Sequence, residues 1–305
     1  MPGPVLQTFQ LSKSYGSRLA VDRLDLAVEA GEIFGFLGPN GAGKTTTIRM
    51  ALGLIRPSSG RVEVLGKDVH RHRAEVLPQV GALVESPALY TYLSGRDNLR
   101  AVGDALGGVP RARIDELLEL VELSGRGDKV RAYSLGMKQR LGIAMALLND
   151  PDLLILDEPA NGLDPQGVVD MRDLLRRLAA AGKTVFISSH VLSEVQQVCT
   201  RVAILNLGRL VKVATVSELT AAGGEFELTV DEPARVLELL RAQAWGASAR
   251  LEEGMLVTGA PTGRARDLVR FLAASGIWPD RVVERQRDLE DIFLDLTHGS
   301  EASAS

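Results

Sequence analysis

The glycine-rich segment Gly38–Thr45 constrains the fold more than any other part of this 305-residue chain. It reads Gly-Pro-Asn-Gly-Ala-Gly-Lys-Thr and follows the short apolar run Glu32–Leu37. After it, Lys44–Ile55 carries apolar residues at helical spacing and stops at Pro57. Glycines let the backbone curl so that successive N–H groups point at phosphate oxygens, and a following helix adds its positive N-terminal end. Strand, glycine turn and helix therefore predict a phosphate-binding loop.

Two side chains at the end of this loop carry the predicted chemistry. We expect Lys44 to reach the β- and γ-phosphates of a nucleotide, and the Thr45 hydroxyl to ligand Mg²⁺. A glycine-rich turn that merely happens to precede a helix is the alternative, and the flanking strand and helix argue against it. The other predicted nucleotide-binding residues of this segment are Gly38, Pro39, Asn40, Gly41, Ala42, Gly43 and Thr46.

A second apolar run, Leu153–Leu156, ends in two adjacent acids and is then broken by Pro159. Acids at the carboxyl end of a parallel strand lie where ligands bind in open α/β sheets. We expect Asp157 to hold Mg²⁺ and Glu158, which points the other way, to polarise the attacking water as general base. Two solvated acids in a surface turn are the alternative reading.

The chain divides into two predicted domains, with the boundary near Thr215–Gly224. Buried apolar strands alternate with helices in residues 1–220, which predicts a mostly parallel sheet covered on both faces, with a helical part over about residues 82–149. Residues 221–298 are predicted as a small α+β domain of two β/α units that closes with a helix over Leu289–Thr297. Residues 299–305 are predicted as a disordered tail.

Composition excludes several classes of protein. The net charge of −4 gives no global basic field for nucleic acid or an anionic membrane. The single cysteine, Cys199, excludes a disulfide framework and fits a reducing compartment. The longest apolar stretches, such as Leu141–Leu148, fall far short of the ~20 residues that span a bilayer. We therefore expect a cytoplasmic chain without a membrane segment and without direct lipid insertion.

Three further segments make the resemblance to a known family specific. Tyr133–Arg140 looks like the signature sequence of ATP-binding cassette (ABC) ATPases, Asn161–Asp164 resembles their D-loop, and Ser188–His190 resembles their switch-histidine segment. The resemblance implies the fold of a P-loop nucleoside triphosphatase of ABC type. Such a fold has a RecA-like, mostly parallel core, an antiparallel β subdomain and a helical subdomain. The last part of the chain is similar to the C-terminal extension of some bacterial exporter ATPases.

The resemblance also assigns roles to individual residues. Tyr15 would stack on adenine, with an exposed strand-end tyrosine as the alternative. Ser134 and Gly136 would contact the γ-phosphate of the ATP bound to the other subunit. His190 would contact the γ-phosphate and, with Lys44 and Glu158, complete the catalytic set. Asp164 would cross the dimer interface, with an ordinary helix N-cap as the alternative.

The chain departs from the family pattern at two positions. Where the family usually has a metal-binding glutamine, Glu85 follows Gly81 at the corresponding spacing. A glutamate still offers an oxygen to Mg²⁺, and the same substitution resembles the bacitracin- and lantibiotic-type exporters. The usual glycine–glutamine pair of the signature is Gly136-Met137 here, and we expect function to survive because Ser134 and the glycine make the phosphate contacts.

The function predicted from the sequence is ATP hydrolysis that drives a membrane exporter. The chain would form a head-to-tail homodimer around two Mg-ATP, or pair with a paralogous ATPase. It would bind separate transmembrane permease subunits on the cytoplasmic face of the plasma membrane, partly through Tyr90–Gly95. The alternatives are a cytosolic cassette ATPase acting on the ribosome or nucleic acid, and a module that uses ATP only to switch shape. The transported substrate stays open.

Overall fold

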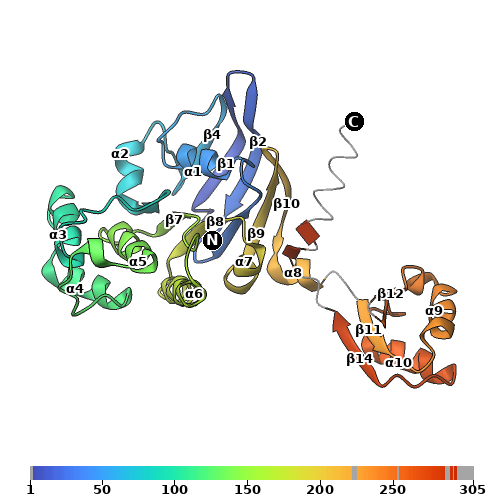
Figure 1. Cartoon of the computed structure of the whole chain (residues 1–305). Helices are drawn as coiled ribbons and strands as arrows, with labels where there is room; N and C mark the ends of the chain where they lie inside the picture. Colours follow the sequence, from blue (N-terminus) through green and yellow to red (C-terminus); the bar gives the residue numbers. More distant parts are fainter. Residues whose placement is uncertain (1–2, 222–224, 253, 286–288, 291, 294–305) are drawn as a thin grey trace. The chain divides into compact units, whose positions relative to one another are not determined.

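The short apolar runs form a six-stranded sheet in the computed structural model, which describes residues 3–221, 225–252, 254–285, 289–290 and 292–293 (Figure 1). Five neighbouring strands are parallel, and β10 joins antiparallel to β9. The strands β3, β7 and β8 are buried along their whole length, which explains the apolar run that each contains. The order across the sheet is β10 (Arg209–Thr215), β9 (Arg201–Asn206), β3 (Ile33–Leu37), β8 (Thr184–Ser189), β7 (Leu153–Asp157) and β6 (Val80–Leu83).

An antiparallel sheet packs beside this one. Its order is β2 (Arg18–Val28), β1 (Leu6–Tyr15), β4 (Ser59–Val64) and β5 (Lys67–Asp68). The alternating patterns around residues 5–9 and 24–28 mark only parts of β1 and β2, which form a longer hairpin. The backbone of Gln10 has φ 45°, and the pairing of β1 with β2 shifts register there, which interrupts the alternation that sequence reading relies on.

The core of this part of the chain lies around α1 (Lys44–Ala51), the helix after the glycine-rich loop. Ile48 and Met50 of α1 belong to one apolar cluster that also contains residues of both sheets, such as Leu24 and Phe36. The helix ends earlier than the predicted Ile55, because Gly53 takes the left-handed φ of 62° that commonly ends helices.

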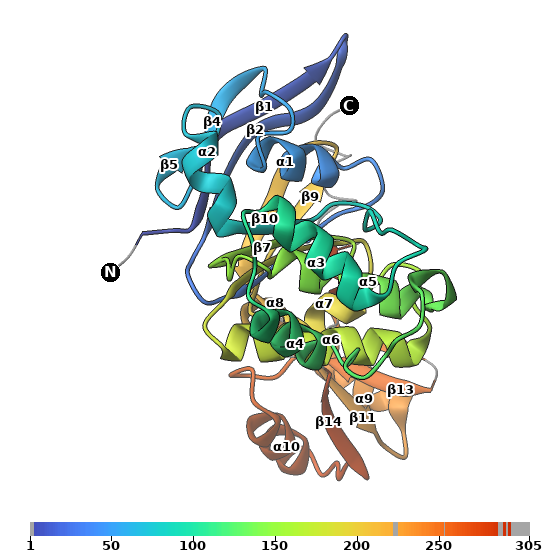
Figure 2. The same cartoon turned by 90° about the vertical axis from the view of Figure 1, so that its left-hand side faces the viewer.

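Three helices lie together in Figure 2 and form the predicted helical part: α3 (Gly95–Ala105), α4 (Arg111–Leu120) and α5 (Leu135–Ala146). Short helices precede two of them, namely α2 (Arg73–Val76) with the 3₁₀ turn η1 (Leu77–Gln79), and the 3₁₀ turn η2 (Val130–Ala132). Two more helices pack against the parallel sheet: α6 (Pro165–Ala180) contacts β3 and β8, and α7 (Leu192–Val198) contacts β3.

The described residues divide structurally into two units, residues 3–216 with Phe293, and the described part of residues 217–292. After α8 (Val216–Ala221), the second unit has the element order β-α-β-β-α-β of a ferredoxin-like fold. Its strands form one antiparallel sheet in the order β12-β13-β11-β14, an order that the prediction of two β/α units did not specify. The elements are β11 (Glu225–Thr229), α9 (Pro233–Arg241), η3 (Ala244–Gly246), β12 (Arg250–Glu252), β13 (Met255–Thr258), α10 (Ala265–Ala274) and β14 (Arg281–Arg285).

Two predictions concern C-terminal residues that the structure describes only in part or not at all. Most of the closing helix predicted over Leu289–Thr297, and the whole predicted tail 299–305, lie outside them. Within the described residues, no helix combines the length and the apolar character that crossing a membrane requires.

Candidate functional site

The glycine-rich loop has the backbone shape that its sequence predicts. Gly43 has φ 103° and caps α1, and a Cβ atom there would lie 2.5 Å from the Ala20 carbonyl oxygen. A Cβ at Gly38 would lie 2.6 Å from the Leu205 carbonyl oxygen. Both positions therefore exclude any larger residue. The loop connects β3 to α1, so the N-terminal end of the helix opens at the carboxyl edge of the sheet.

The Lys44 side chain is buried at the start of α1 and folds back over the loop. Its ammonium donates a hydrogen bond to the Gly38 carbonyl oxygen at 2.7 Å and lies 3.2 Å from Glu158 Oε1. A buried charge needs such partners, because desolvation without them is costly. The lysine charge is thus held inside the loop by two carbonyl groups, those of Gly38 and Pro39, and by one carboxylate.

Asp157 lies at the end of β7, beside β8 and close to the start of α1. Its Oδ2 accepts a hydrogen bond from the Thr45 hydroxyl at 2.8 Å, and its Oδ1 accepts one from the Ser188 hydroxyl at 2.5 Å. The carboxylate is 4% exposed. The two predicted metal ligands, Thr45 and Asp157, are therefore neighbours although 112 residues separate them.

Glu158 joins two of the other predicted catalytic residues. Its Oε2 lies 2.7 Å from Nδ1 of His190, while Oε1 faces Lys44. The Glu158 backbone has the left-handed φ of 51°, and its N–H donates to both the carbonyl and the hydroxyl oxygen of Ser188. Such a backbone conformation is unusual for a residue other than glycine, and it turns the side chain away from Asp157 toward the loop.

A solvent-open hollow of about 550 Å³ lies over the loop. Tyr15, at the end of β1, is half exposed on its rim, and the Lys13 ammonium lies 5.3 Å from the tyrosine ring centre. An aromatic ring and phosphate-binding groups thus line one hollow. The lining residues are Tyr15, Arg18, Ala20, Asn40, Gly41, Gly43, Lys44, Thr45, Thr46, Glu158, Asn161 and His190.

Several predicted residues are not among the described residues that line this hollow. Ser134 caps α5, its Oγ accepting a hydrogen bond from the Met137 N–H at 3.3 Å. Asp164 caps α6 in the same way through the Gly167 N–H at 2.9 Å. Gly136 is half-buried in the first turn of α5, and a Cβ added there would meet only Leu163, at 3.7 Å. These residues lie at two helix N-termini outside the hollow.

Glu85 also lies outside the hollow. It follows β6, the strand next to β7, and its backbone has φ 63°. Its exposed carboxylate forms an ion pair with Arg49 of α1. The predicted role of Glu85 as a metal ligand therefore requires this pair to open, and it stays a prediction.

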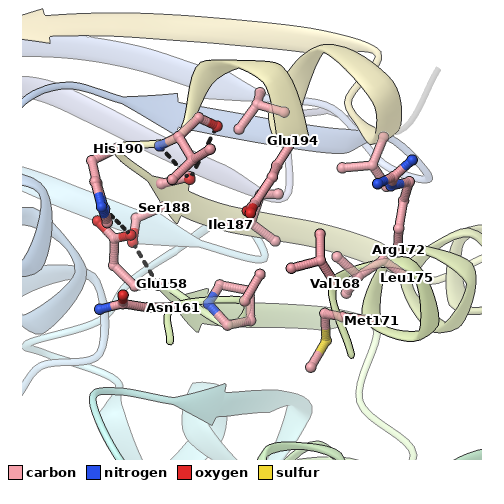
Figure 3. Close-up of a pocket in the computed structure, with 16 residues that line it drawn as sticks. Glu158, Asn161, Val168, Met171, Arg172, Leu175, Ile187, Ser188, His190 and Glu194 are labelled. Atoms are coloured by element: carbon pink, nitrogen blue, oxygen red, sulfur yellow. Dashed lines mark hydrogen bonds and ion pairs between the residues drawn. The ribbon is translucent and has the colours of Figure 1, made fainter. Parts of the chain in front are cut away.

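A second, smaller cavity lies next to Glu158, between α6 and α7 (Figure 3). Glu158 and His190 are at one end of it, and Arg172 and Leu175 are at the other. The cavity holds about 30 Å³, which is room for one water molecule. Glu194 lines it, and burial raises the pKa of this carboxyl, although the charges of His190 and Arg172 act in the opposite direction.

The comparison with known proteins identifies the family. The family model described as "ABC transporter" matches residues 21–161. The "Bacitracin transport ATP-binding protein BcrA" of Bacillus licheniformis is 41% identical over 300 residues, which cover 97% of this chain and 98% of that protein. The chain belongs to the ABC transporter family. It is an ATPase of that family and binds ATP, as the sequence predicted, and the resemblance to the bacitracin branch is confirmed.

Other ABC proteins give the same result. The "Daunorubicin resistance ATP-binding protein DrrA3" of Streptomyces coeruleorubidus is 39% identical over 301 residues, 93% of each chain. Among solved structures, an "ATP binding subunit of ABC transporter" is 29% identical with a TM-score of 0.64, covering 72% of this chain and 92% of that one. The cbiO1 protein of Clostridium perfringens is 26% identical with a TM-score of 0.66, covering 79% and 96%. The predicted fold class is therefore confirmed.

Three polar residues at the site of this ABC ATPase were not predicted from the sequence. Arg18, at the start of β2, brings a positive charge to the hollow, but nothing in its local sequence marks it. Asn161 lines the same hollow and was named only as part of the D-loop segment. The Ser188 hydroxyl connects the two acids, Asp157 and Glu158, and its position next to the switch histidine was the available signal.

Proposed function

We propose that this ABC ATPase is the energy-coupling subunit of an exporter, and that ATP bound in the hollow over Gly38–Thr45 is hydrolysed there. The observation that supports this most is the convergence of Lys44, Glu158 and His190, from three distant segments, on one phosphate-binding loop. Phosphoryl transfer depends mainly on positioning and charge neutralisation, and these groups supply both.

ATP binding would rearrange the contacts that these side chains make with one another. Lys44 would exchange the Gly38 carbonyl oxygen and Glu158 for the β- and γ-phosphate oxygens, while backbone N–H groups of the loop bind the phosphates. Glu158, released from Lys44, would accept a proton from the attacking water, and His190 would hold the γ-phosphate. Tyr15 on the rim would stack on the adenine.

The proposed magnesium site fits the residues present. Thr45 and Asp157 offer a hydroxyl and a carboxylate oxygen 2.8 Å apart, the hard oxygen donors that Mg²⁺ prefers. Mg²⁺ is usually bound by one or two protein groups together with substrate phosphates, and the described residues contain no cluster of three or more acidic, histidine or cysteine ligands. When bound, the ion would neutralise charge on the β- and γ-phosphates.

The signature residues would act on a second copy of the chain. Ser134 and Gly136 begin α5, whose positive N-terminal end suits a phosphate, and Leu135 between them is 45% exposed. Because these residues lie outside their own hollow, we propose that two copies pair head-to-tail with the signature of each completing the site of the other. A paralogous ATPase in place of the second copy would satisfy the same geometry.

A groove and an exposed aromatic pair would receive the separate permease subunits. The groove, about 850 Å³, lies among η1, β6 and the ends of α3 and α5, with an apolar lining that includes Leu77, Val102 and Met145. Tyr90 and Tyr92 are 49% and 63% exposed, and their rings contact edge to face with centres 5.9 Å apart. A short amphipathic helix of a permease is the occupant that these features suit.

The reported relatives favour export over the alternative functions. BcrA is named for bacitracin transport and DrrA3 for daunorubicin resistance, and both match nearly the whole chain. We therefore place the protein on the cytoplasmic face of a membrane, attached through its permease. Action on the ribosome or on nucleic acid has no comparable support.

A complementation assay tests the proposed site and its dimer together. Lys44→Ala removes the phosphate contact of one hollow, and Ser134→Arg blocks the signature that serves the other. Each variant alone should be inactive. An equimolar mixture should regain about a quarter of the parental turnover, since about half of the dimers are mixed and each mixed dimer has one complete site. A mixture that forms dimers but stays inactive at every ratio would contradict head-to-tail pairing.

Membrane attachment tests the export role. In cells that express the protein with its native permease, the chain should sediment with membranes, and Tyr90→Ser with Tyr92→Ser should release it to the supernatant while keeping its ATP binding. Sedimentation with ribosomes in detergent-treated extracts would contradict the proposal.

A further inference from the structure

Asn98, on the second turn of α3, is a fully buried polar residue whose side chain makes three hydrogen bonds. Its Oδ1 accepts from the Tyr90 N–H at 2.8 Å, and its Nδ2 donates to the carbonyl oxygens of Tyr90 at 3.0 Å and Ser94 at 2.9 Å. One carboxamide thus binds both backbone groups of Tyr90. Buried groups matched in this way specify a single loop conformation, because any other conformation leaves them unpaired.

The loop that Asn98 holds, residues 90–94, is joined in turn to the segment 129–132. The Arg131 N–H donates to the Thr91 carbonyl oxygen at 2.9 Å, and the Val130 N–H donates to that of Leu93 at 2.8 Å. Ser94 and Lys129 form an antiparallel bridge. Two segments about 40 residues apart in sequence are therefore connected through their backbones, and Val130 is completely buried.

The segment 129–132 runs directly into the signature. Tyr133 follows it, is 4% exposed, and packs closely on Gly95 at the start of α3, where an added Cβ would lie 2.9 Å from the tyrosine hydroxyl. Ser134 comes next and caps α5. The path from Asn98 through the loop 90–94 to Ser134 is thus a continuous set of hydrogen bonds and packed side chains.

We propose that Asn98 is a positioning residue that makes the exposed loop 90–94 and the signature segment 129–137 one rigid body. Resting on the proposed function, this means that Asn98 sets where Ser134 meets the ATP of the second copy. A displacement of Tyr90 and Tyr92 by a permease then moves Ser134 as well. The role is indirect, because Asn98 does not line the hollow over the phosphate-binding loop.

Amide hydrogen exchange of the nucleotide-free chain tests the rigid body without relying on activity. Asn98→Leu removes all three side-chain hydrogen bonds. Asn98→Ser disturbs packing less, since its hydroxyl is able to bond the Ser94 carbonyl oxygen one turn back while both bonds to Tyr90 are lost. Gln79→Leu is the matched control, because Gln79 is exposed and its carboxamide makes one hydrogen bond, to the Glu75 carbonyl oxygen.

Both Asn98 variants should speed exchange at the Val130 and Arg131 amides by at least about tenfold, the effect of losing one to two net hydrogen bonds. The amides of β7 and β8 should keep parental rates, and Gln79→Leu should change none of these positions. Faster exchange confined to residues 90–98 would overturn the proposal, because it would show that the loop moves without the signature segment. If Asn98→Leu does not fold, Asn98→Ser decides the result.

Comparing the ATP binding of Asn98→Ser with its rate of ATP hydrolysis distinguishes a positioning role from general structural damage. Asn98→Ser should bind a fluorescent ATP analogue with the parental Kd, since the phosphate-binding loop is untouched, but should hydrolyse ATP about tenfold more slowly. Unchanged turnover together with faster exchange at Arg131 would overturn the positioning role. A parental chain that fails to hydrolyse ATP would instead contradict the proposed function, and the exchange experiment would still decide whether the two segments form one body.

Discussion

Replacing Glu158 by glutamine tests whether this side chain acts as the general base or only contacts Lys44 and His190. The carboxylate lies 3.2 Å from the Lys44 ammonium and 2.7 Å from Nδ1 of His190. Glutamine keeps the shape and one acceptor oxygen, but it carries no charge and cannot take a proton from water. Glu158→Gln should therefore bind ATP and hydrolyse it very slowly.

The two effects have different magnitudes. Loss of a general base lowers turnover by about 10²–10⁴-fold, or roughly 3–5 kcal/mol of barrier. The affinity for ATP, in contrast, should increase. ATP must displace Glu158 from its ion pair with Lys44, so removing this competitor should tighten ATP binding by about tenfold, or roughly 1.4 kcal/mol.

Single-turnover hydrolysis and equilibrium binding of a fluorescent ATP analogue measure the two effects separately, and light scattering reports the ATP-bound dimer that should accumulate. Glu194→Gln is the matched control. It removes a carboxyl from the cavity next to Glu158, yet in the part of the chain that the structure describes Glu194 makes no hydrogen bond or ion pair. Its turnover should stay within about twofold of the parent, as for a substitution that touches no reacting group. Parental turnover in Glu158→Gln, or an equal loss in Glu194→Gln, would refute the assignment of the general base.

Three further predictions follow from the packing around the site. Gly43→Ala should abolish ATP binding in a titration and lower the free energy of unfolding by at least about 1–3 kcal/mol, because it adds a Cβ at φ 103° against a β2 carbonyl oxygen; parental affinity would contradict this. Ser188→Ala should lower the free energy of unfolding by about 1–3 kcal/mol in urea, because a buried hydroxyl bonded to Asp157 is lost; an unchanged midpoint would show that water replaces it. Asp150→Asn should cost only about 0.5 kcal/mol at pH 7, because the residue is mostly exposed. The hydrogen bond from Lys183 lowers the pKa of Asp150 below its usual 3.8, so its stabilisation is present above that pH and is lost as the pH falls through the folded value. Parent and variant should therefore converge in acid unfolding once the pH falls below the folded pKa of Asp150, and a constant difference would contradict the linkage.

The local parts of the site could be predicted because short-range physics determines them. A buried strand, a glycine turn and a helix start follow one another in residues 33–51, and their conformations depend on neighbours in sequence. The same holds for the helix caps at Ser134 and Asp164, because each side chain accepts a hydrogen bond from the backbone N–H three residues later. The resemblance to ABC ATPases added the roles of these residues, which local patterns do not contain.

The irregular parts escaped prediction for physical reasons. The register shift at Gln10 hid most of the β1–β2 hairpin, and with it Arg18, whose place at the hollow depends on that hairpin. Glu85 matched the family spacing, but its pairing with Arg49 depends on where α1 lies beside β6. The single antiparallel sheet of the second unit depends on which strands pair, and the order of elements alone does not specify pairing.

By itself, the sequence determined the phosphate-binding loop, the paired acids and the absence of an apolar run long enough to span a bilayer. Each of these features depends only on residues that are consecutive in the chain. Only the tertiary structure decided that Thr45 meets Asp157 and that Glu158 bridges Lys44 and His190. The reason is the order of the sheet. Because β8 lies between β3 and β7 and all three are parallel, their carboxyl ends meet at one edge, and segments more than 100 residues apart become neighbours there.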